Sequence, residues 1–518
     1  MTERGKPHAA TILEALDEHA VTTPQALAID SVTYAELRSV SLRVAAALRQ
    51  RGISDGERVV LYAENGHAFV FALLGVLRAG AVAVPANVLY READLRRVIE
   101  DSEASAIAVS AQSRSFVPAG TKATVIALAD VVKWAGDASL EEREAKQLRA
   151  KDLALLIYTS GTTGLAKGAM LTHANLAAIA AQLISAWEWT SQDVLLLTLP
   201  LFHVHGLCAG LGGTLVAGAS LVLRERFDAD EVAALLGAGG CSMFFGVPTM
   251  YVRLLERADD VRFDALRLFV SGSAALPASV QEAFLTRFGA SILERYGSTE
   301  FGFALTNRYH GRRYPGTVGF PFPRVCVRLI GTDDRDVAIG AIGEIAVSGP
   351  NVCAGYWRNA AATAAAFFHD QEGRRWYRSG DLATFDEERG YTIVGRTKEL
   401  IISGGFNIYP REIEDELLLY PGVRAAAVVG RGDAARGELP IAVVEADPSL
   451  DFEAVLTHLR TRLASFKIPK ALYRSEALPR NALGKVDKPR LRTMLEDEGY
   501  RIAGECYGPT TTRTKFSG

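Results

Sequence analysis

Short apolar runs with the character of β-strands alternate with amphipathic helical runs through most of the chain. RVVLYA (58–63), VAVPANV (82–88) and AIAVSA (106–111) are three of the strand-like runs. AFVFALLGVLRAG (68–80) and READLRRVIEDS (91–102) separate them and have the apolar spacing of helices. Strands that alternate with helices of this length typically form βαβ units, in which helices cover a parallel sheet. The alternation therefore predicts an α/β fold.

The pattern changes twice further along the chain. After about residue 320, short strand-like runs are separated by Gly and Asp turns, which indicates a β-rich subdomain. These runs are RVCVRLIG (324–331), GEIAVSG (343–349) and GYTIVGR (390–396). Beyond them, helical and strand patterns begin again in close succession, as in a small α+β domain. The 518 residues suggest roughly two to four domains, and we expect an N-terminal domain over 1–396, a C-terminal domain over 397–497 and a flexible tail over 498–518.

The charge balance bears on which partners the protein binds, and the cysteines bear on its cellular compartment. The chain has 57 basic and 60 acidic residues and a net charge of −3, which gives no electrostatic reason to expect a nucleic-acid partner. Its 5 cysteines are scattered without a C-x-x-C pair, so we expect reduced thiols and a cytoplasmic location. The N-terminus lacks the apolar core of a signal peptide, and Arg78 and Pro85 interrupt the longest apolar stretch, so no membrane span is expected. A monomer and a homodimer both remain open.

One loop, YTSGTTGLAKGAM (158–170), has the composition of a phosphate-binding site. It follows LALLIYTS, a continuous apolar run typical of a strand buried on both faces, and precedes a helical run for which Thr172 is the expected N-cap. Glycines let backbone N–H groups turn toward an anion, hydroxyls add donors, and Lys167 adds a positive charge. A polyphosphate is therefore the expected ligand. The loop is not a Walker A motif, because Ala166 rather than glycine precedes the lysine.

YTSGTTGLAKGAMLTH (158–173) resembles the phosphate loop of the adenylate-forming (ANL) superfamily, which includes acyl-CoA synthetases, firefly luciferase and the adenylation domains of peptide synthetases. Further matches follow in the order of that family and cover about residues 30–490: PLFHVHGL, VSGSAAL, RYGSTE, YRSGDL, GRTKELIISGGFNIYPREIE and PRNALGKVDK. The resemblance implies a two-step ligase that uses ATP, Mg²⁺ and coenzyme A. A carboxylate and ATP would give an acyl-adenylate and pyrophosphate. The small C-terminal domain would then rotate as a mobile lid, and the CoA thiol would release AMP.

The resemblance also implies catalytic roles for four residues. Glu300 in RYGSTE would serve Mg²⁺, a hard ion that prefers oxygen ligands and substrate phosphates. Lys485 in PRNALGKVDK would reach the carboxylate and the α-phosphate, where an ammonium stabilises the charge that gathers during attack on phosphorus. His205 matches an aromatic gate between the acyl pocket and the thiol tunnel, and Thr159 opens the phosphate loop. Taken alone, Lys485 could be one more exposed lysine near Lys488, and His205 a packed core histidine.

The remaining nucleotide contacts come from the same motifs. Small residues at 272–274 would let adenine approach closely, Tyr296 would stack on it, and Asp381 and Arg396 would bind the ribose. The full set implied for ATP and AMP is Thr159, Ser160, Gly161, Thr162, Thr163, Gly164, Lys167, Gly272, Ser273, Ala274, Tyr296, Gly297, Thr299, Asp381, Arg396 and Lys485.

The second half-reaction would depend on the C-terminal domain. Lys398 matches the hinge position between the domains, and Ser403, Gly404 and Gly405 match a loop that lines the thiol tunnel after the lid rotates. The nucleotide part of CoA has no reliable motif, so an amine acceptor or a carrier-protein thiol remains an alternative. A catalytically silent nucleotide-binding protein is a third possibility, and the presence of Lys167, Glu300 and Lys485 argues against it.

Two arginines bear on which acid is activated. Arg295 directly precedes Tyr296, and Arg253 lies in GVPTMYVRLLERA, a helix that Pro248 can start and that flanks the acyl site in the family. Two guanidinium groups would hold a second carboxylate through paired hydrogen bonds. FGVPTMYVRLL, VSGSAALP and ERYG-TE resemble malonyl-CoA synthetases, in which both arginines hold the distal carboxylate of malonate or methylmalonate. A small dicarboxylate is therefore the expected substrate.

Other features of these motifs favour different interpretations. Ser298 stands where malonyl-CoA synthetases usually have methionine, and Phe301 and Phe303 follow, so the pocket could suit a bulkier or aromatic acid. Ser298 belongs to the expected substrate contacts together with His205, Arg253 and Arg295. Each arginine also has a purely structural alternative, because Arg253 could pair with Glu256 and Arg295 with Glu294.

Overall fold

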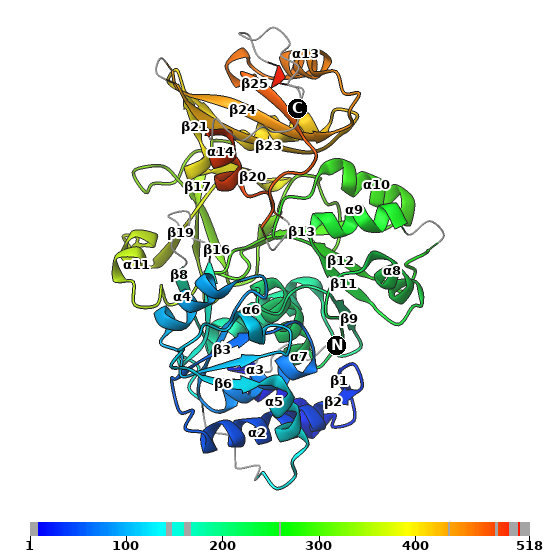
Figure 1. Ribbon diagram of the computed structural model, residues 1–518. Helices are drawn as coiled ribbons and strands as arrows, with labels where there is room; N and C mark the ends of the chain where they lie inside the picture. The colour runs from blue at the N-terminus through cyan, green and yellow to red at the C-terminus, as the bar shows by residue number, and fades with distance from the viewer. Residues whose placement is uncertain are drawn as a thin grey trace.

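The computed structural model describes residues 9–140, 148–159, 167–257, 261–433, 436–481, 485–496 and 506–507. A large body contains two helix-covered sheets, and a smaller domain from the C-terminal part of the chain sits at one end of it (Figure 1). A β-rich subdomain lies between the two. This architecture confirms the predicted α/β fold class, with its β-rich subdomain and small C-terminal domain.

The first sheet of the body has six strands in the order β6-β5-β3-β4-β7-β8. Its strands are parallel from β6 to β7, and only β8 is antiparallel to its neighbour. The predicted alternation is thus confirmed, because helices return the chain between parallel strands. The strands are β3 (Arg58–Tyr62), β4 (Val82–Pro85), β5 (Ala106–Val109), β6 (Thr124–Ala127), β7 (Leu153–Thr159) and β8 (Lys167–Thr172), and the helical segments are α2 (Tyr34–Gln50), α3 (His67–Arg78), α4 (Glu92–Ser102), the 3₁₀ turn η1 (Arg114–Phe116) and α5 (Leu128–Gly136).

The second sheet has nine strands in the order β15-β14-β13-β12-β11-β9-β10-β1-β2, and its central strands from β13 to β1 are parallel. Its strands are β1 (Leu27–Ile29), β2 (Val32–Thr33), β9 (Val194–Leu197), β10 (Ser220–Leu223), β11 (Met243–Gly246), β12 (Leu268–Ser271), β13 (Ile292–Tyr296), β14 (Leu305–Thr306) and β15 (Phe320–Pro321). The helices of this part are α1 (Ile12–Thr22), α6 (His173–Trp187), the π-helical segment η2 (His205–Gly212), α7 (Gly213–Ala217), α8 (Ala229–Gly237), α9 (Pro248–Arg257) and α10 (Ala278–Phe288).

Helix α6 connects the two sheets and begins as the sequence predicts. The Thr172 side chain accepts a hydrogen bond from the backbone N–H of Asn175, which forms a capping box. At the other end Trp187 is fully buried, and its ring meets those of Phe245 and Phe322 edge-on at centroid distances of 5.4 and 5.8 Å. Its indole N–H donates to the hydroxyl of Thr306 at 3.0 Å, so this large side chain is both packed and satisfied.

The last two sheets form the subdomain and the lid. The five-stranded subdomain sheet is antiparallel and contains β16 (Cys326–Ile330), β17 (Gly343–Ser348), β18 (Phe367–His369), β19 (Arg375–Asp386) and β20 (Gly390–Arg396), with α11 (Ala360–Ala366) beside it. The lid has a core of its own around Ile413, Val428 and Leu459. Its elements are η3 (Thr397–Glu399), β21 (Ile401–Ser403), β22 (Phe406–Ile408), α12 (Pro410–Leu418), β23 (Val423–Asp433), β24 (Gly437–Ala446), α13 (Phe452–Arg462), η4 (Ser465–Lys467), β25 (Ala471–Ser475), α14 (Lys488–Glu496) and β26 (Cys506–Tyr507).

Strand β26 lies in the stretch that the sequence predicts to be a loose tail. It pairs antiparallel with β25, with Tyr507 opposite Leu472, so the prediction of a structureless tail does not hold for these two residues. The open edge of β25 offers unpaired backbone groups, which a short segment satisfies whatever its side-chain pattern. Among the described residues, no helix is long and apolar enough to cross a membrane.

Candidate active site

The loops after β12 and β13 leave the nine-stranded sheet at the carboxyl ends of its parallel strands, which is where open α/β sheets bind ligands. Residues 272–274 follow β12, and Tyr296 ends β13. Strand β19 of the subdomain brings Asp381 to the same place, and the lid brings Lys485. Body, subdomain and lid therefore meet at β13, which lies directly below the lid in Figure 1.

Three residues predicted to bind the nucleotide contact one another. The Asp381 carboxylate accepts a hydrogen bond from the Tyr296 hydroxyl at 2.6 Å and pairs with Nε of Arg396 at 2.9 Å. The register of β19 and β20 sets Asp381 opposite Arg396. Burial and the nearby Asp381 charge raise the pKa of Tyr296, so its hydroxyl stays protonated and continues to donate. Asp381 is thereby held as a fixed acceptor, which suits a sugar diol.

The segment expected to touch adenine is shaped by its small residues. Gly272 is buried, Ser273 is half-buried with a left-handed φ of 69°, and Ala274 is exposed. Gly297 in the neighbouring loop permits a close backbone approach, because a Cβ atom there would lie 1.9 Å from the carbonyl oxygen of Gly302. Thr299, which follows in the same loop, is half-buried.

Glu300 is a buried carboxylate held by two hydroxyl groups. Its Oε1 accepts from the Tyr356 hydroxyl at 2.9 Å, and its Oε2 accepts from the Ser298 hydroxyl at 2.9 Å. Only 8% of Glu300 is exposed, and no described Lys, Arg or His pairs with it. The described residues also contain no cluster of three His, Cys, Asp or Glu side chains that could enclose a metal alone. An unpaired buried carboxylate fits Mg²⁺ whose other ligands are phosphate and water oxygens.

The two ends of the predicted phosphate loop are adjacent. Thr159 closes β7 and Lys167 opens β8, and the two residues are paired across these strands. The Thr159 hydroxyl donates to the Lys167 carbonyl oxygen at 3.4 Å, and Nζ of Lys167 lies 5.2 Å from the centre of the Tyr356 ring. The other loop residues predicted to bind phosphate lie outside the described residues: Ser160, Gly161, Thr162, Thr163 and Gly164.

Lys485 and Lys488 have different surroundings although they are close in sequence. Burial lowers the pKa of Lys485 to about 8, and the positive charges of Arg396 and Arg295 lower it further against the attraction of Asp381. The half-buried Lys485 therefore lies within electrostatic range of Arg396, Arg295 and Asp381. Lys488 instead pairs with two glutamates of the lid side, Glu399 at 2.8 Å and Glu414 at 2.7 Å.

Arg295 is a buried guanidinium in a narrow slot. It is 4% exposed, and its Nε and Nη2 atoms have no hydrogen-bond partner. The Phe303 ring covers one side, with its centre 4.4 Å from Cζ, and a Cβ atom at Gly272 would lie 2.5 Å from that Cζ. Burial lowers the pKa of Arg295 to about 9, so the group still carries its charge at neutral pH. Glu294 is not its partner in an ion pair: Oε1 of Glu294 accepts from the Leu276 backbone N–H at 2.9 Å, and its Oε2 is buried without a hydrogen-bond partner.

His205 adjoins this arginine at the start of η2. Its ring stacks on Phe245 and meets Phe303 edge-on, both at centroid distances of 6.1 Å, and its Nδ1 lies 3.5 Å from the Ser273 hydroxyl. Nε2 is buried without a partner. Burial, followed by the charge of Arg295, lowers the pKa of His205, so the ring is neutral. It is a packed core histidine, and it also borders the space beside Arg295.

Arg253, the other predicted carboxylate ligand, has a different environment. It lies on the exposed face of α9, which begins at Pro248 as predicted. None of the interactions of the described residues joins it to Arg295 or pairs it with Glu256. Ser298, a predicted substrate contact, donates its hydroxyl to Glu300 instead. The two-arginine clamp stays a prediction, and the geometry described supports only its Arg295 side.

The predicted thiol-tunnel loop is a tight hairpin on the lid. Ser403 pairs with Phe406 across Gly404 and Gly405, whose φ angles of 57° and 83° are those of a two-residue hairpin turn. Ser403 is buried, while the two glycines and Phe406 are exposed. Lys398 is exposed within η3, at the point where the chain leaves the subdomain sheet for the lid sheet. The hinge and tunnel roles stay predictions.

Sequence reasoning missed several residues of this site. Tyr356 contacts both Glu300 and Lys167, and Tyr377 lies behind it with a hydroxyl–hydroxyl distance of 3.1 Å. His203 also borders this site, where burial and the nearby charges of Lys485 and Arg295 lower its pKa to about 3. No spacing in the sequence marks Tyr356, because it comes from a loop between β17 and α11.

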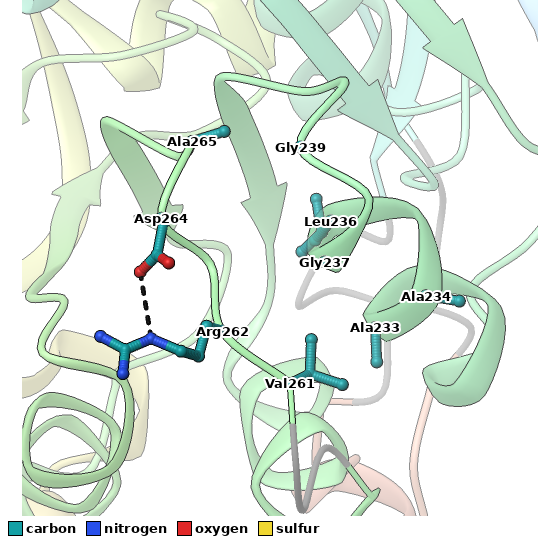
Figure 2. Close-up of a pocket in the computed structure, with 9 residues that line it drawn as sticks. All are labelled: Ala233, Ala234, Leu236, Gly237, Gly239, Val261, Arg262, Asp264 and Ala265. Carbon is teal, nitrogen blue, oxygen red and sulfur yellow. Dashed lines mark hydrogen bonds and ion pairs between the residues drawn. The ribbon is translucent and has the colours of Figure 1, made fainter.

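A shallow depression of about 570 Å³ lies elsewhere, between α8 and residues 261–265 (Figure 2). Its lining is mostly Ala and Gly, and its two charged residues, Arg262 and Asp264, pair with each other at 3.4 Å. It gathers none of the polar groups that converge beside β13. We therefore assign the candidate site to the region around Glu300 and Asp381.

Known proteins share both the sequence and the fold of this chain. The model of the AMP-binding enzyme family matches residues 16–357, and that of the AMP-binding enzyme C-terminal domain matches residues 412–485. A feruloyl-CoA synthase from Amycolatopsis sp is 37% identical over 89% of this chain and 94% of its own. A mitochondrial malonate–CoA ligase from Mus musculus is 35% identical over 90% of this chain and 88% of its own. The crystal structure of ATP-bound MatB from Rhodopseudomonas palustris superimposes with a TM-score of 0.88 at 37% identity and covers 95% of this chain and 100% of its own.

The fold and these matches define an AMP-forming acid–thiol ligase, which consumes ATP to join a carboxylic acid to CoA. The chain belongs to the AMP-binding enzyme family, in the adenylate-forming superfamily, as the sequence resemblance predicts.

Proposed function

We propose that this ligase activates a small dicarboxylate such as malonate or methylmalonate, and that Arg295 binds the carboxylate that does not react. The single observation that carries this proposal is the buried Arg295 guanidinium, whose Nε and Nη2 have no partner. A buried charge without a partner costs several kcal/mol, so the site needs an anion there when the acid is bound. A carboxylate suits it, because guanidinium N–H groups bind carboxylates in pairs.

The surroundings of Arg295 support selection of a short acid. The Phe303 ring covers one side of the guanidinium, and the backbone at Gly272 lies so close that a Cβ atom there would be 2.5 Å from Cζ. These two contacts restrict the directions in which the group can move to admit a long chain. The names of the relatives divide between substrates, since one is a feruloyl-CoA synthase and another a malonate–CoA ligase.

A bulkier aromatic acid is the second candidate, and one observation favours it. His205 is bordered by the rings of Phe245 and Phe303, which is an apolar aromatic environment. An aromatic acid that carries a phenol or methoxy oxygen would still offer an acceptor to Arg295. An apolar aromatic pocket discriminates poorly between acids that differ only in size. In this alternative, the arginine would select acids whose oxygen can accept its hydrogen bond.

The chemistry assigned to the site follows from charge. We infer that the substrate carboxylate attacks the α-phosphorus of ATP, a new oxygen–phosphorus bond forms, and pyrophosphate leaves. Lys485 would stabilise the negative charge that gathers on the phosphoryl oxygens, and Asp381 would hold the ribose. Glu300 would hold a Mg²⁺ ion, which supplies charge neutralisation to the phosphates. After the lid turns at Lys398, the CoA thiol would attack the acyl carbonyl and AMP would leave.

An acid panel tests the proposal. Pyrophosphate release is measured with malonate, methylmalonate, succinate, acetate, octanoate, benzoate and ferulate, each with and without CoA. With wild-type enzyme, we expect the highest kcat/KM for malonate or methylmalonate. For Arg295→Gln, we expect kcat/KM for these two acids to fall about 100-fold, from the loss of roughly 3 kcal/mol of charge-assisted hydrogen bonding, and that for acetate to change little.

Arg253→Gln is the matched control, because it removes the same charge from the exposed face of α9. A selective loss for dicarboxylates in that variant would establish the two-arginine clamp. A uniform loss across all acids in Arg295→Gln would reject the dicarboxylate proposal. A wild-type preference for ferulate would support the aromatic alternative. A pyrophosphate signal that does not depend on CoA would favour another acceptor.

A further inference from the structure

We propose that Tyr356 is a positioning residue that fixes the metal-binding carboxylate of Glu300 and the phosphate-loop ammonium of Lys167 relative to each other. This inference rests on the proposed function, in which Glu300 serves Mg²⁺ and Lys167 serves the phosphates. Tyr356 is the described side chain that contacts both groups: its hydroxyl is 2.9 Å from Oε1 of Glu300, and its ring is 5.2 Å from Nζ of Lys167.

The hydroxyl of Tyr356 has a defined direction. A carboxylate only accepts hydrogen bonds, so the Tyr356 hydroxyl must be the hydrogen-bond donor to Glu300. The Tyr377 hydroxyl, 3.1 Å from that of Tyr356, is then the donor in the next bond. Both tyrosines are buried, at 7% and 5% exposure. The resulting chain from Tyr377 through Tyr356 to Glu300 leaves one rotational position for the carboxylate, with Ser298 holding its other oxygen.

The backbone around Tyr356 ties together the two loops that the reaction uses. The carbonyl of Gly355 accepts from Met170 at 2.9 Å, and the Trp357 N–H donates to Gly168 at 2.8 Å, so the segment pairs with β8 directly after Lys167. Just upstream, the Cys353 N–H donates to the Glu300 backbone carbonyl at 2.7 Å. One short segment therefore pairs with the strand that leaves the phosphate loop and with the loop that carries the metal carboxylate.

This arrangement assigns two separable tasks to one side chain. The hydroxyl orients Glu300, which should set the affinity for the divalent ion. The ring faces the ammonium of Lys167, which should set the affinity for the triphosphate even without metal. Substitution by phenylalanine removes only the first contact, whereas leucine removes both.

The test measures binding of Mn²⁺, as a paramagnetic substitute for Mg²⁺, to the full-length enzyme with α,β-methylene-ATP, by the loss of the free-ion EPR signal. For Tyr356→Phe, we expect the Mn²⁺ dissociation constant to rise about 10-fold, the lower end of the range for residues that orient a metal ligand. Binding of the analogue without metal, measured by calorimetry, should stay unchanged. For Tyr356→Leu, the metal-free affinity for the analogue should also fall, by at least roughly threefold, since a cation–π contact is worth about 0.5–1 kcal/mol even at an exposed site and this ring is buried.

Tyr377→Phe is the matched control, because it removes a neighbouring buried hydroxyl and leaves the Tyr356–Glu300 bond in place. It should change Mn²⁺ affinity much less than Tyr356→Phe. Equal effects of the two variants, or an unchanged Mn²⁺ affinity in Tyr356→Phe, would overturn the inference. Glu300→Gln separates this outcome from failure of the proposed function. If that variant binds Mn²⁺ as the wild type does, the metal role of Glu300 itself is wrong.

Discussion

The position of Lys485 predicts a pH dependence that distinguishes the two half-reactions. In the folded enzyme, burial and the charges of Arg396 and Arg295 lower the pKa of its ammonium from 10.5 to about 8. Because only the protonated form stabilises phosphoryl charge, kcat/KM for ATP should be level below about pH 7 and fall above about pH 8. A single group with this pKa is about one-tenth protonated at pH 9, so adenylation should then have lost roughly 90% of its rate.

The measurement is pyrophosphate release at low ATP and saturating acid between pH 6 and pH 10. kcat/KM for ATP is the appropriate quantity, because it reports the pKa of the enzyme before ATP binds and not of the ATP complex. Lys485→Arg should lower the level of the profile and remove the break near pH 8, since a guanidinium stays charged throughout this range. Lys485→Ala should cripple adenylation and spare CoA attack on supplied acyl-adenylate.

Three results would refute this reasoning. A wild-type profile that falls only near pH 10 would show that the ammonium is not held among Arg295, Arg396 and Asp381. A break near pH 8 that persists in Lys485→Arg would assign the titration to another group. Equal loss of both half-reactions in Lys485→Ala would contradict a role confined to adenylation.

Two further substitutions test the slot around Arg295 and the anchoring of the lid. Gly272→Ala places a Cβ atom 2.5 Å from the Arg295 guanidinium carbon, so that group must shift. We expect kcat/KM for the preferred acid to fall about 100-fold, while thermal stability changes little. An unchanged kcat/KM would show that the guanidinium is free to move. Lys488→Met leaves Glu399 and Glu414 without their cation. The free energy of unfolding, measured by urea titration, should fall by roughly 3 kcal/mol. A decrease below about 1 kcal/mol would mean that water replaces the lysine.

The regular elements of the body could be predicted because periodicity is a local property of the sequence. RVVLYA, for example, became β3, whose last four residues are buried, and Thr172 capped α6 as its side chain and spacing indicated. Strand β26 could not be foreseen, because its pairing depends on a free edge of β25 rather than on its own residues.

The candidate site likewise contains residues that could be predicted from local motifs and contacts that could not. Tyr296, Asp381 and Arg396 were predicted from separate motifs, and the structure joins them through two contacts. Contacts such as that of Tyr356 with Glu300 join residues 56 positions apart and leave no periodic trace in the sequence. The sequence left both a substrate-facing and an exposed position open for Arg253, because the exposure of each residue of α9 depends on what packs against that helix.

The ion pair between Asp381 and Arg396 lies at the last residue of β20, directly before the η3 turn that leads into the lid. A rotation of the lid about Thr397–Glu399 would therefore act first on the same guanidinium that pairs with Asp381, the carboxylate proposed to bind the ribose. If nucleotide occupancy biases the lid through this pair, thermodynamic reciprocity requires that lid orientation change nucleotide affinity by the same factor. The same equilibrium between lid orientations would then determine both how tightly AMP is retained and how readily the thiol attacks.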